Sequence, residues 1–259
     1  MSFRLSRLLF PALLAGIVGI ASTSEAAILL TGDTWSENFN GYRGTAATIP
    51  DGWVAAGDLV YYNGSPNDGN AQNGIFTAGS SLYNTASGWY AMNSTADPTD
   101  YAFGLRTQTS STSSLTAQFI NGTGGTLSDF TVNWDFEQYS EGYGNGRVSL
   151  LWSTDGTNFS TLDLAGGIVQ TGAFGASPPV VYTTPTVTEL TAALSYDLAD
   201  GDSLYIRFLW NSSKSGNQPH IAVDNFQLTA VPESSTIVLL SVAGALFGLM
   251  SRRRFIARA

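Results

Sequence analysis

The chain of 259 residues contains no cysteine and a single histidine, His220. The lack of cysteine excludes a disulfide framework and all thiol chemistry. Zinc sites built from cysteines or from several histidines are excluded as well. A Ser/His/Asp triad would have to use His220, which follows a Gly/Asn/Ser-rich stretch, and no Gly-x-Ser-x-Gly motif accompanies it. We therefore predict that His220 is a polar surface residue without a catalytic role.

Basic residues are also scarce, and they gather at the two ends of the chain. The sequence has 11 Lys and Arg against 20 Asp and Glu, and only five of the basic residues but 18 of the acidic ones fall between residues 27 and 230. That central part has a net charge of −13. Such a surface repels nucleic acid and anionic lipid, so neither is an expected partner.

Residues 1–26 have the pattern of a secretory signal peptide. Arg4 and Arg7 precede an apolar stretch from Leu8 to Ala21, and Ser24-Glu25-Ala26 places small residues at the −3 and −1 positions of a cleavage site. We predict export through the Sec route with cleavage between Ala26 and Ala27. The alternative is a permanent N-terminal anchor.

Residues 231–259 form a tail with three parts: Val231-Pro232-Glu233-Ser234, an apolar segment (236–250) and a basic end (251–259) with Arg252, Arg253 and Arg254. The uncharged run from Ile237 to Met250 would span roughly 21 Å as a helix. A relaxed membrane span takes about 20 residues, or roughly 30 Å. Local thinning of the bilayer and snorkelling arginines compensate for this shortfall. We predict a transmembrane helix with the arginines in the cytoplasm; the alternative is a buried helix.

The order and spacing of these three parts resemble the PEP-CTERM sorting signal of exported bacterial proteins. Ser234 stands where that signal usually has a second proline. The resemblance implies that an exosortase, a membrane protease-transpeptidase of Gram-negative bacteria that make exopolysaccharide, recognises the tail. It also implies a transient stay in the inner membrane, followed by a location at the cell surface or outside the cell, in a biofilm matrix.

Residues 27–230 are predicted to form one all-β domain. Thr131–Gln138 alternates, with Val132, Trp134 and Phe136 on one face, and Leu204–Trp210 alternates in the same way. Further strands are expected at Trp53–Tyr62, Gly88–Met92, Tyr101–Leu105, Leu115–Ile120, Arg147–Trp152 and Ala222–Thr229. Turn pairs such as Asp155-Gly156 and Asp200-Gly201 separate the strands. Short strands at this spacing predict an antiparallel β-sandwich, or jelly roll.

Two segments add a second resemblance. Ser149–Phe159 and Ile221–Leu228 are similar to parts of the jelly-roll ectodomains related to carbohydrate-binding and MAM-like modules. In such modules a structural calcium ion often joins a Glu near the first strand to an Asp on the last strand. The resemblance therefore implies a calcium site at Glu37 and Asp224, and it supports a function only by analogy.

Two ligand-directed functions remain open beside a non-catalytic role at the cell surface. A carbohydrate-binding module needs exposed aromatic planes, for which Tyr62, Trp89 and Tyr139 are the candidates, whereas most other tryptophans are expected in the core. A glycoside hydrolase needs two carboxylates, and Asp135 and Glu137 share one face of a strand about 7 Å apart. The simpler interpretation of these two acids is a solvated outer face. We expect an exported, non-catalytic surface or matrix protein associated with exopolysaccharide.

Overall fold

The computed structural model describes residues 26–57, 74–78, 88–106, 112–141, 146–162, 168–170, 181–212 and 219–232. Residues 1–25 of the predicted signal peptide, Tyr62 and the tail from Glu233 onward lie outside the described residues. Within the described ranges, no helix has the length and apolarity that crossing a membrane requires. The described part is built from strands and one short 3₁₀ turn, η1 (Ala46–Thr48), so the all-β prediction is confirmed.

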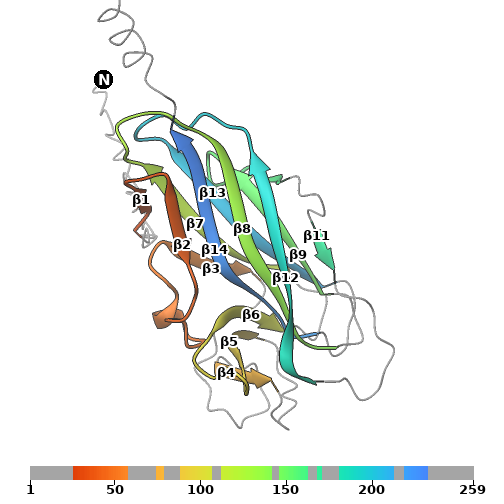
Figure 1. Cartoon of the computed structure of the whole chain (residues 1–259). Helices are drawn as coiled ribbons and strands as arrows, with labels where there is room; N and C mark the ends of the chain where they lie inside the picture. The colour runs from red at the N-terminus through yellow and green to blue at the C-terminus, as the bar shows by residue number, and fades with distance from the viewer. Residues whose placement is uncertain are drawn as a thin grey trace, which may run out of the picture.

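The strands form two sheets that lie face to face (Figure 1). Sheet A has the strand order β1-β7-β13-β9-β10, with β3 also paired to β7 and β11 to β9. Its strands are β1 (Ile28–Leu30), β3 (Trp53–Gly57), β7 (Thr112–Asn121), β9 (Gly146–Ser153), β10 (Ser160–Thr161), β11 (Ile168–Gln170) and β13 (Ser203–Ser212).

Sheet B has the strand order β12-β8-β14-β6-β5-β4, and β2 pairs with the second half of β14. Its strands are β2 (Thr34–Glu37), β4 (Gly74–Ala78), β5 (Gly88–Ser94), β6 (Ala102–Arg106), β8 (Leu127–Ser140), β12 (Val181–Leu194) and β14 (Ile221–Pro232). The pairs β1/β7 and β4/β5 are parallel, so the sandwich is mostly, not wholly, antiparallel.

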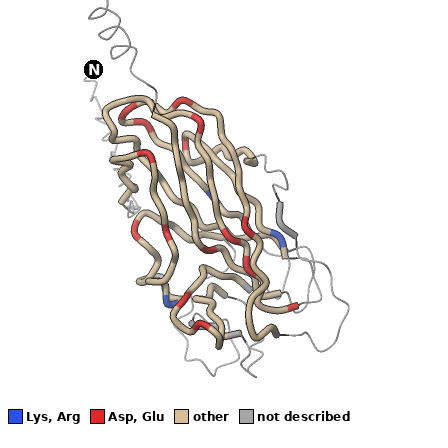
Figure 2. The backbone as a smooth tube through the Cα atoms, viewed as in Figure 1, with Lys and Arg blue, Asp and Glu red and all other residues tan. Residues whose placement is uncertain are grey.

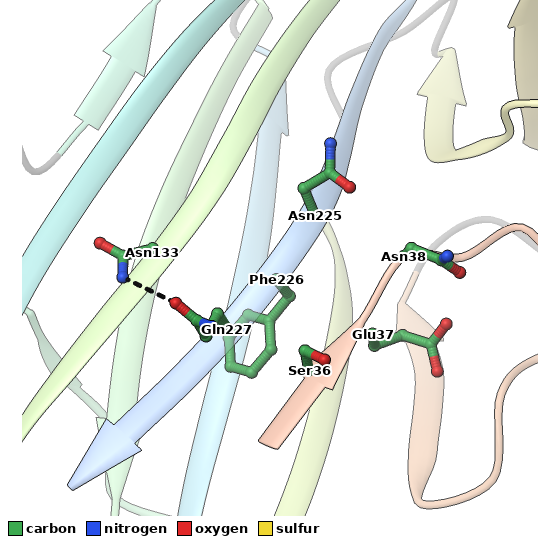
Figure 3. A pocket seen from close by; sticks show the side chains of 7 residues that line it. All are labelled: Ser36, Glu37, Asn38, Asn133, Asn225, Phe226 and Gln227. Carbon is green, nitrogen blue, oxygen red and sulfur yellow. Dashed lines mark hydrogen bonds between the residues drawn. The ribbon is translucent and has the colours of Figure 1, made fainter. Parts of the chain in front are cut away.

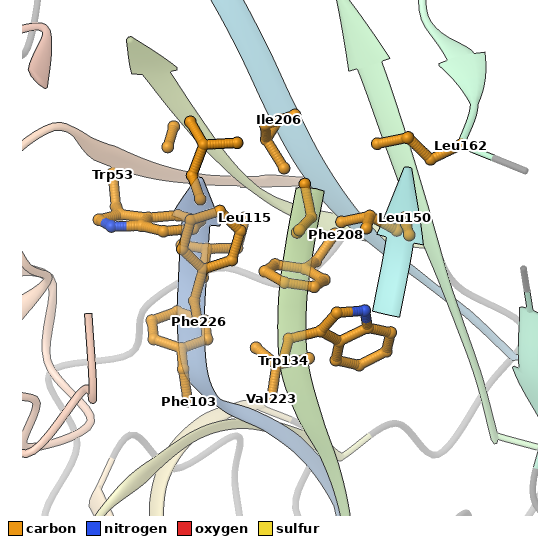
Figure 4. Close-up of a cluster of buried hydrophobic side chains, with 14 of the residues drawn as sticks. Trp53, Phe103, Leu115, Trp134, Leu150, Leu162, Ile206, Phe208, Val223 and Phe226 are labelled. Atoms are coloured by element: carbon orange, nitrogen blue, oxygen red, sulfur yellow. The ribbon is translucent and has the colours of Figure 1, made fainter. Parts of the chain in front are cut away.

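The core between the sheets is rich in aromatic rings (Figure 4). The predicted alternation is confirmed, because Val132, Trp134 and Phe136 on β8 are buried together with the inward residues of β13. The ring of Phe208 lies 5.0 Å from that of Trp134 and 6.1 Å from that of Trp53, measured between centroids. Pairs at such distances add about 0.5–1.5 kcal/mol each to the gain from burial. The core therefore holds β8, β13 and β14 rigidly.

Sheet B is curled. Although β12 and β4 stand at opposite ends of its strand order, β12 contacts both β4 and β5. A hydrogen bond of 3.5 Å from Thr95 Oγ1, just after β5, to the carbonyl oxygen of Thr183 joins this end of the sheet to β12. The outer face of sheet B, which points away from the core, is therefore partly enclosed at the end where β4, β5 and β6 lie (Figure 1).

The last strand passes the predicted end of the domain at residue 230. Val231 pairs with Ser128 and Pro232 with Leu127, so the first two residues of the predicted sorting motif belong to β14. The side chain of Val231 is 55% exposed. The sandwich therefore runs directly into the motif.

Candidate functional site

Four polar side chains form a straight row across the outer face of sheet B. Ser36 on β2 is in register with Gln227 on β14, Gln227 with Asn133 on β8, and Asn133 with Thr191 on β12. Thr191 Oγ1 donates to Asn133 Oδ1 at 2.8 Å, and Asn133 Nδ2 donates to Gln227 Oε1 at 3.3 Å. Neighbouring strands are ~4.8 Å apart, so the row presents amide and hydroxyl groups at that repeat.

An open depression lies beside this row (Figure 3). Its lining consists of Ser36, Glu37, Asn38, Asn133, Asn225, Phe226 and Gln227. Asn225 has a positive φ of 48° at a β-bulge, where the register between β14 and β8 shifts, and its side chain is exposed. Asn225 Nδ2 donates to Asp135 Oδ2 at 2.8 Å. The bulge thus adds a third side-chain amide beside Asn133 and Gln227.

We call the region of β2, β12 and the facing parts of β8 and β14 that carries Ser36, Asn133, Thr191 and Gln227 the open half of this face. Ser36, Thr191 and Gln227 are exposed, and Asn133 is half-buried. Donors and acceptors in such a row suit a ligand that is itself rich in hydroxyl groups.

The covered half of the same face lies toward β5 and β6. Its floor consists of small residues, Ala102, Gly104 and Ala222, and the side chain of Met92 lies over Gly104. A Cβ atom at position 104 would lie 2.4 Å from Met92 Sδ, so glycine is required for this close approach. The buried rings of Tyr90 and Tyr139 complete a second hydrophobic cluster with Met92, Ala102 and Ala222.

Two carboxylates lie buried beside this cluster. Glu137 Oε2 accepts a hydrogen bond from the Tyr139 hydroxyl, which also approaches the carbonyl oxygen of Met92 at 3.2 Å. Burial raises the pKa of Glu137 to about 7, although the Tyr139 hydrogen bond lowers it. The pKa of Tyr139 itself is raised, chiefly by burial and then by the charge of Glu137.

Asp224 is the second buried carboxylate. Burial raises its pKa to about 8, the backbone N–H of Asn225 offsets part of the rise, and the charges of Glu137, Asp100 and Asp135 add to it. Its side chain is 1% exposed. The sequence interpretation of Asp135 and Glu137 as a solvated pair is therefore wrong for Glu137, because the curl of sheet B covers this end of β8.

His220 is also buried, contrary to the prediction of a surface residue. Its Nδ1 and the hydroxyl of Ser140 are 2.8 Å apart, and the same hydroxyl accepts the backbone N–H of His220 at 3.0 Å. The ring lies edge-on to Tyr90 at 6.2 Å. This contact ties the residue before β14 to the end of β8, and because both side chains are 0% exposed it offers no open nucleophile.

The predicted glycan-binding aromatics do not form an exposed platform. Trp89 packs in the main core, 5.3 Å from Trp210 between centroids, and Tyr139 belongs to the covered half. Both are buried, so their prediction as exposed planes is wrong, and Tyr62 lies outside the described residues. Alternation turns Tyr90 on β5 and Tyr139 on β8 to the outer face of sheet B, but the outer face is covered at this end.

The predicted calcium ligands lie on paired strands. Glu37 is opposite Phe226, two residues along β14 from Asp224. Glu37 Oε1 accepts the backbone N–H of Phe39 at 2.7 Å, and burial raises the pKa of Glu37. Among the described residues, no three His, Asp or Glu side chains are grouped to hold a metal ion. The calcium site stays a prediction.

The residues of the open half were not singled out from the sequence. Asn133 lies on the polar side of the alternating segment Thr131–Gln138, and that side was interpreted only as a solvated surface. Thr191 belongs to β12, a strand of 14 residues that was not predicted at all. Its Thr/Val-rich composition is typical of a strand, but Pro185 interrupts it where the pairing with β8 shifts register.

No protein-family model matches the sequence, and a search among curated proteins finds no relative. Solved structures with a similar fold include TmCBM61 in complex with β-1,4-galactotriose, at 14% identity and a TM-score of 0.34, covering 75% of this chain and 99% of that one. The K3 cleaved adhesin domain of Lys-gingipain from Porphyromonas gingivalis W83 is 13% identical, with a TM-score of 0.42 and coverages of 75% and 98%.

The CBM22-1 xylan-binding domain from Paenibacillus barcinonensis Xyn10C is 13% identical, with a TM-score of 0.39, and the match covers 80% of this chain and 97% of that domain. All three TM-scores lie below 0.5. The similarity to these β-structures therefore identifies neither a family nor a ligand for this chain.

Proposed function

We propose that this protein is exported and binds polysaccharide, without catalysing a reaction, across the open half of sheet B. The observation that carries the proposal is the in-register row Ser36–Gln227–Asn133–Thr191 beside the open depression. A row of amide and hydroxyl groups across four strands can hydrogen-bond successive hydroxyl groups of an extended glycan, and the rigid core beneath it keeps the row in place.

The two acids that a hydrolase would use are poorly placed for catalysis. Glu137 is 6% exposed, and its Oε2 is bonded to the Tyr139 hydroxyl, so it does not reach a glycosidic oxygen on the open half. Asp135 accepts a hydrogen bond from Asn225 on the same face. This arrangement supports binding over hydrolysis. If the protein were instead a secreted glycoside hydrolase, it would turn over a glycan, and Glu137→Gln would abolish that turnover.

The binding proposal is tested by a polysaccharide array followed by titration calorimetry on the best glycan. Removing the two amides with Asn133→Ala and Gln227→Ala is expected to weaken binding about tenfold, because each hydrogen bond contributes roughly 0.5–1.5 kcal/mol and tenfold corresponds to about 1.4 kcal/mol. Gln118→Ala is the matched control, since Gln118 lies on the outer side of sheet A and bonds to Ser203. Retention of full affinity by the double variant, or no retained glycan on the array, contradicts the proposal.

The proposal includes delivery through the tail. Val231, Pro232 and Glu233 with Arg252–Arg254 are expected to be recognised by an exosortase while the apolar segment holds the chain in the inner membrane. Because β14 ends at Pro232, the protease would meet Glu233 directly after the last paired residue. Carrying arginine to the membrane centre costs ~2.5–3.5 kcal/mol or more, which keeps the basic end in the cytoplasm.

Delivery is tested by blotting membrane and extracellular fractions with an antibody to the sandwich. Pro232→Ala with Glu233→Ala should leave full-length protein in the membrane, whereas wild type should be released without its last ~26 residues, and N-terminal sequencing of released protein should begin at Ala27. Release and shortening of the double variant at the wild-type level would show that the tail is only an anchor.

A further inference from the structure

The end of β14 holds the first two residues of the proposed sorting motif in a paired strand. Val231 lies opposite Ser128 on β8, and Pro232 lies opposite Leu127. Ser128 Oγ donates a hydrogen bond to the carbonyl oxygen of Val231 at 3.3 Å. The backbone at the start of the motif is therefore held against β8 in the folded sandwich.

The strand to which this end is paired is firmly anchored. The N–H of Leu127 donates to the carbonyl oxygen of Leu198 at 3.0 Å, and the N–H of Leu198 donates back to Leu127 at 2.8 Å. Both leucine side chains are 0% exposed. On the other side of β14, the N–H of Ala230 donates to the carbonyl oxygen of Asp33 at 2.7 Å. As far as Ala230, β14 is thus held from both sides.

The last two residues of β14 are held less firmly. The register between β14 and β8 shifts between Thr229 and Val231, so a bulge separates the last two pairs from the rest of the ladder. Val231 and Pro232 are exposed, so burial of their side chains contributes little to the pairing. Pro232 also has no N–H to donate. This end can therefore detach from β8 while the strand before the bulge stays paired.

Little chain lies between this end and the predicted membrane helix. Residues 233–236 separate Pro232 from the apolar run that starts at Ile237, and four residues span at most roughly 14 Å. Among the described residues, Figure 2 shows acidic and no basic positions at the end of the sandwich where β14 stops. The aspartates at this end are Asp33, Asp129, Asp197, Asp200 and Asp202. An anionic membrane surface repels them, so the sandwich does not settle against the bilayer.

A protease needs access to the backbone of the motif. An extended peptide is bound largely through its main-chain hydrogen bonds, so a segment already paired within a sheet has to leave the sheet first. Cleavage then follows the population of the opened state when opening is fast. Detaching the last two residues of β14 would add roughly 7 Å of free chain at the motif.

We infer that the end of β14 controls release of the protein from the membrane: the protease acts on the motif only while Val231 and Pro232 are detached from β8. This inference rests on the proposed delivery through the tail. The bulge allows the end to open, and the pairing with Ser128 and Leu127 determines how often it is open. The folded sandwich therefore restrains its own release.

The test locks the end of β14 with the double variant Ser128→Cys/Val231→Cys. The chain has no cysteine of its own, and directly opposed residues of antiparallel strands have Cα atoms within the range that a disulfide requires. Release is followed by pulse labelling and blotting of membrane and extracellular fractions, with and without dithiothreitol. The oxidised variant should be released at least about tenfold more slowly than its own reduced form, which carries the same change in the motif.

Two further variants locate the opening. Thr131→Cys/Thr229→Cys locks a register pair before the bulge and should leave the rate of release unchanged. Ser128→Ala removes the hydroxyl that bonds to Val231 and should speed release about twofold, because the closed state loses one exposed hydrogen bond.

The results that would overturn the inference are distinct from those that would overturn delivery. Release of the oxidised Ser128→Cys/Val231→Cys variant at the rate of its reduced form refutes the inference and leaves delivery through the tail standing. Equal blocking by both cross-links also refutes it, since opening would then not be confined to the end of β14. If no disulfide forms, Ser128→Ala decides, and release no faster than that of wild type refutes the inference. Wild type that stays full-length in the membrane refutes the delivery proposal itself.

Discussion

The two halves of the outer face of sheet B share strands β8 and β14, but one half is buried and the other is exposed to solvent. In the covered half, outward side chains such as Tyr139 and Met92 are buried on a floor of Ala102, Gly104 and Ala222. In the open half, outward side chains such as Gln227 and Thr191 remain exposed. Strand alternation determines the side to which a residue points, whereas the curl of the sheet determines whether that side meets water.

The difference also divides structural from ligand-directed roles. A carboxylate in the covered half, such as Glu137, changes its pKa because it is buried, and its replacement is expected to alter stability. A polar group in the open half contributes little to stability and is available for a ligand.

Truncating a buried tyrosine of the covered half should destabilise the protein strongly. Tyr139→Ala is expected to lower the free energy of unfolding by about 3–5 kcal/mol, because a buried ring is lost and a cavity remains. Thr131→Ala, on the same outward side of β8 in its other half, should change it by less than about 0.5 kcal/mol. Urea unfolding of both variants measures the contrast, and equal effects at the two positions would remove it.

The buried carboxyls should make stability fall as the pH rises. The pKa of Glu137 rises from 4.5 to about 7 on folding and that of Asp224 from 3.8 to about 8, so the folded state binds more protons than the unfolded state over this range. Their contribution is therefore complete below about pH 4 and is lost as the pH rises to about 8, with a slope of up to ~1.4 kcal/mol per pH unit for each group. Unfolding midpoints across this range should show the decline.

Asp224→Asn isolates one of the two groups in that pH experiment. The variant should lose part of the slope and be more stable than wild type at pH 8, since it has no buried carboxylate to ionise. Asp202→Asn, in an exposed turn, should keep the wild-type slope. A pH profile that Asp224→Asn leaves unchanged would assign the decline to other groups.

Removing only the hydroxyl of Tyr139 should have an intermediate effect. Tyr139→Phe leaves the ring in place but deprives buried Glu137 of its donor. A buried acceptor without a partner costs about 1–3 kcal/mol. The loss should grow as the pH rises, because the ionised form of Glu137 depends most on the donor. A loss that is the same at pH 5 and pH 8 would show that the hydroxyl is needed for packing alone.

The smallest effect on stability is expected in the row of the open half. Gln227→Ala and Thr191→Ala should each change the free energy of unfolding by less than about 0.5 kcal/mol, since these side chains are exposed. The same variants should still weaken glycan binding. A large stability loss at either position would place the row among the structural residues.

Much of the sandwich could be predicted from the sequence, because alternating segments such as Thr131–Gln138 and Leu204–Trp210 bury one side, and Asp-Gly pairs such as Asp155-Gly156 and Asp200-Gly201 mark turns between strands. The site could not. Its row joins residues from four strands, and nothing local to Asn133 or Gln227 indicates that they share a register. The burial of Tyr139 depends on the curl of sheet B and on small residues far away in sequence, such as Gly104, whereas Trp89 is buried because its side of β5 faces the main core. The Asn225 bulge, which turns an amide outward, is likewise a product of tertiary pairing.

The most direct test of glycan binding at the open half is a titration of the isotope-labelled protein with the best glycan from the polysaccharide array, observed through the side-chain amide signals of Asn and Gln by NMR. If the glycan binds at the open half, the signals of Asn133, Asn225 and Gln227 should shift progressively and saturate together. Those of Asn121, whose Nδ2 bonds to the Gly125 and Leu198 carbonyls, and of Asn158, in the turn after β9, should not move. Saturable shifts confined to Asn121 or Asn158, with the amides of the open half unchanged, would contradict it.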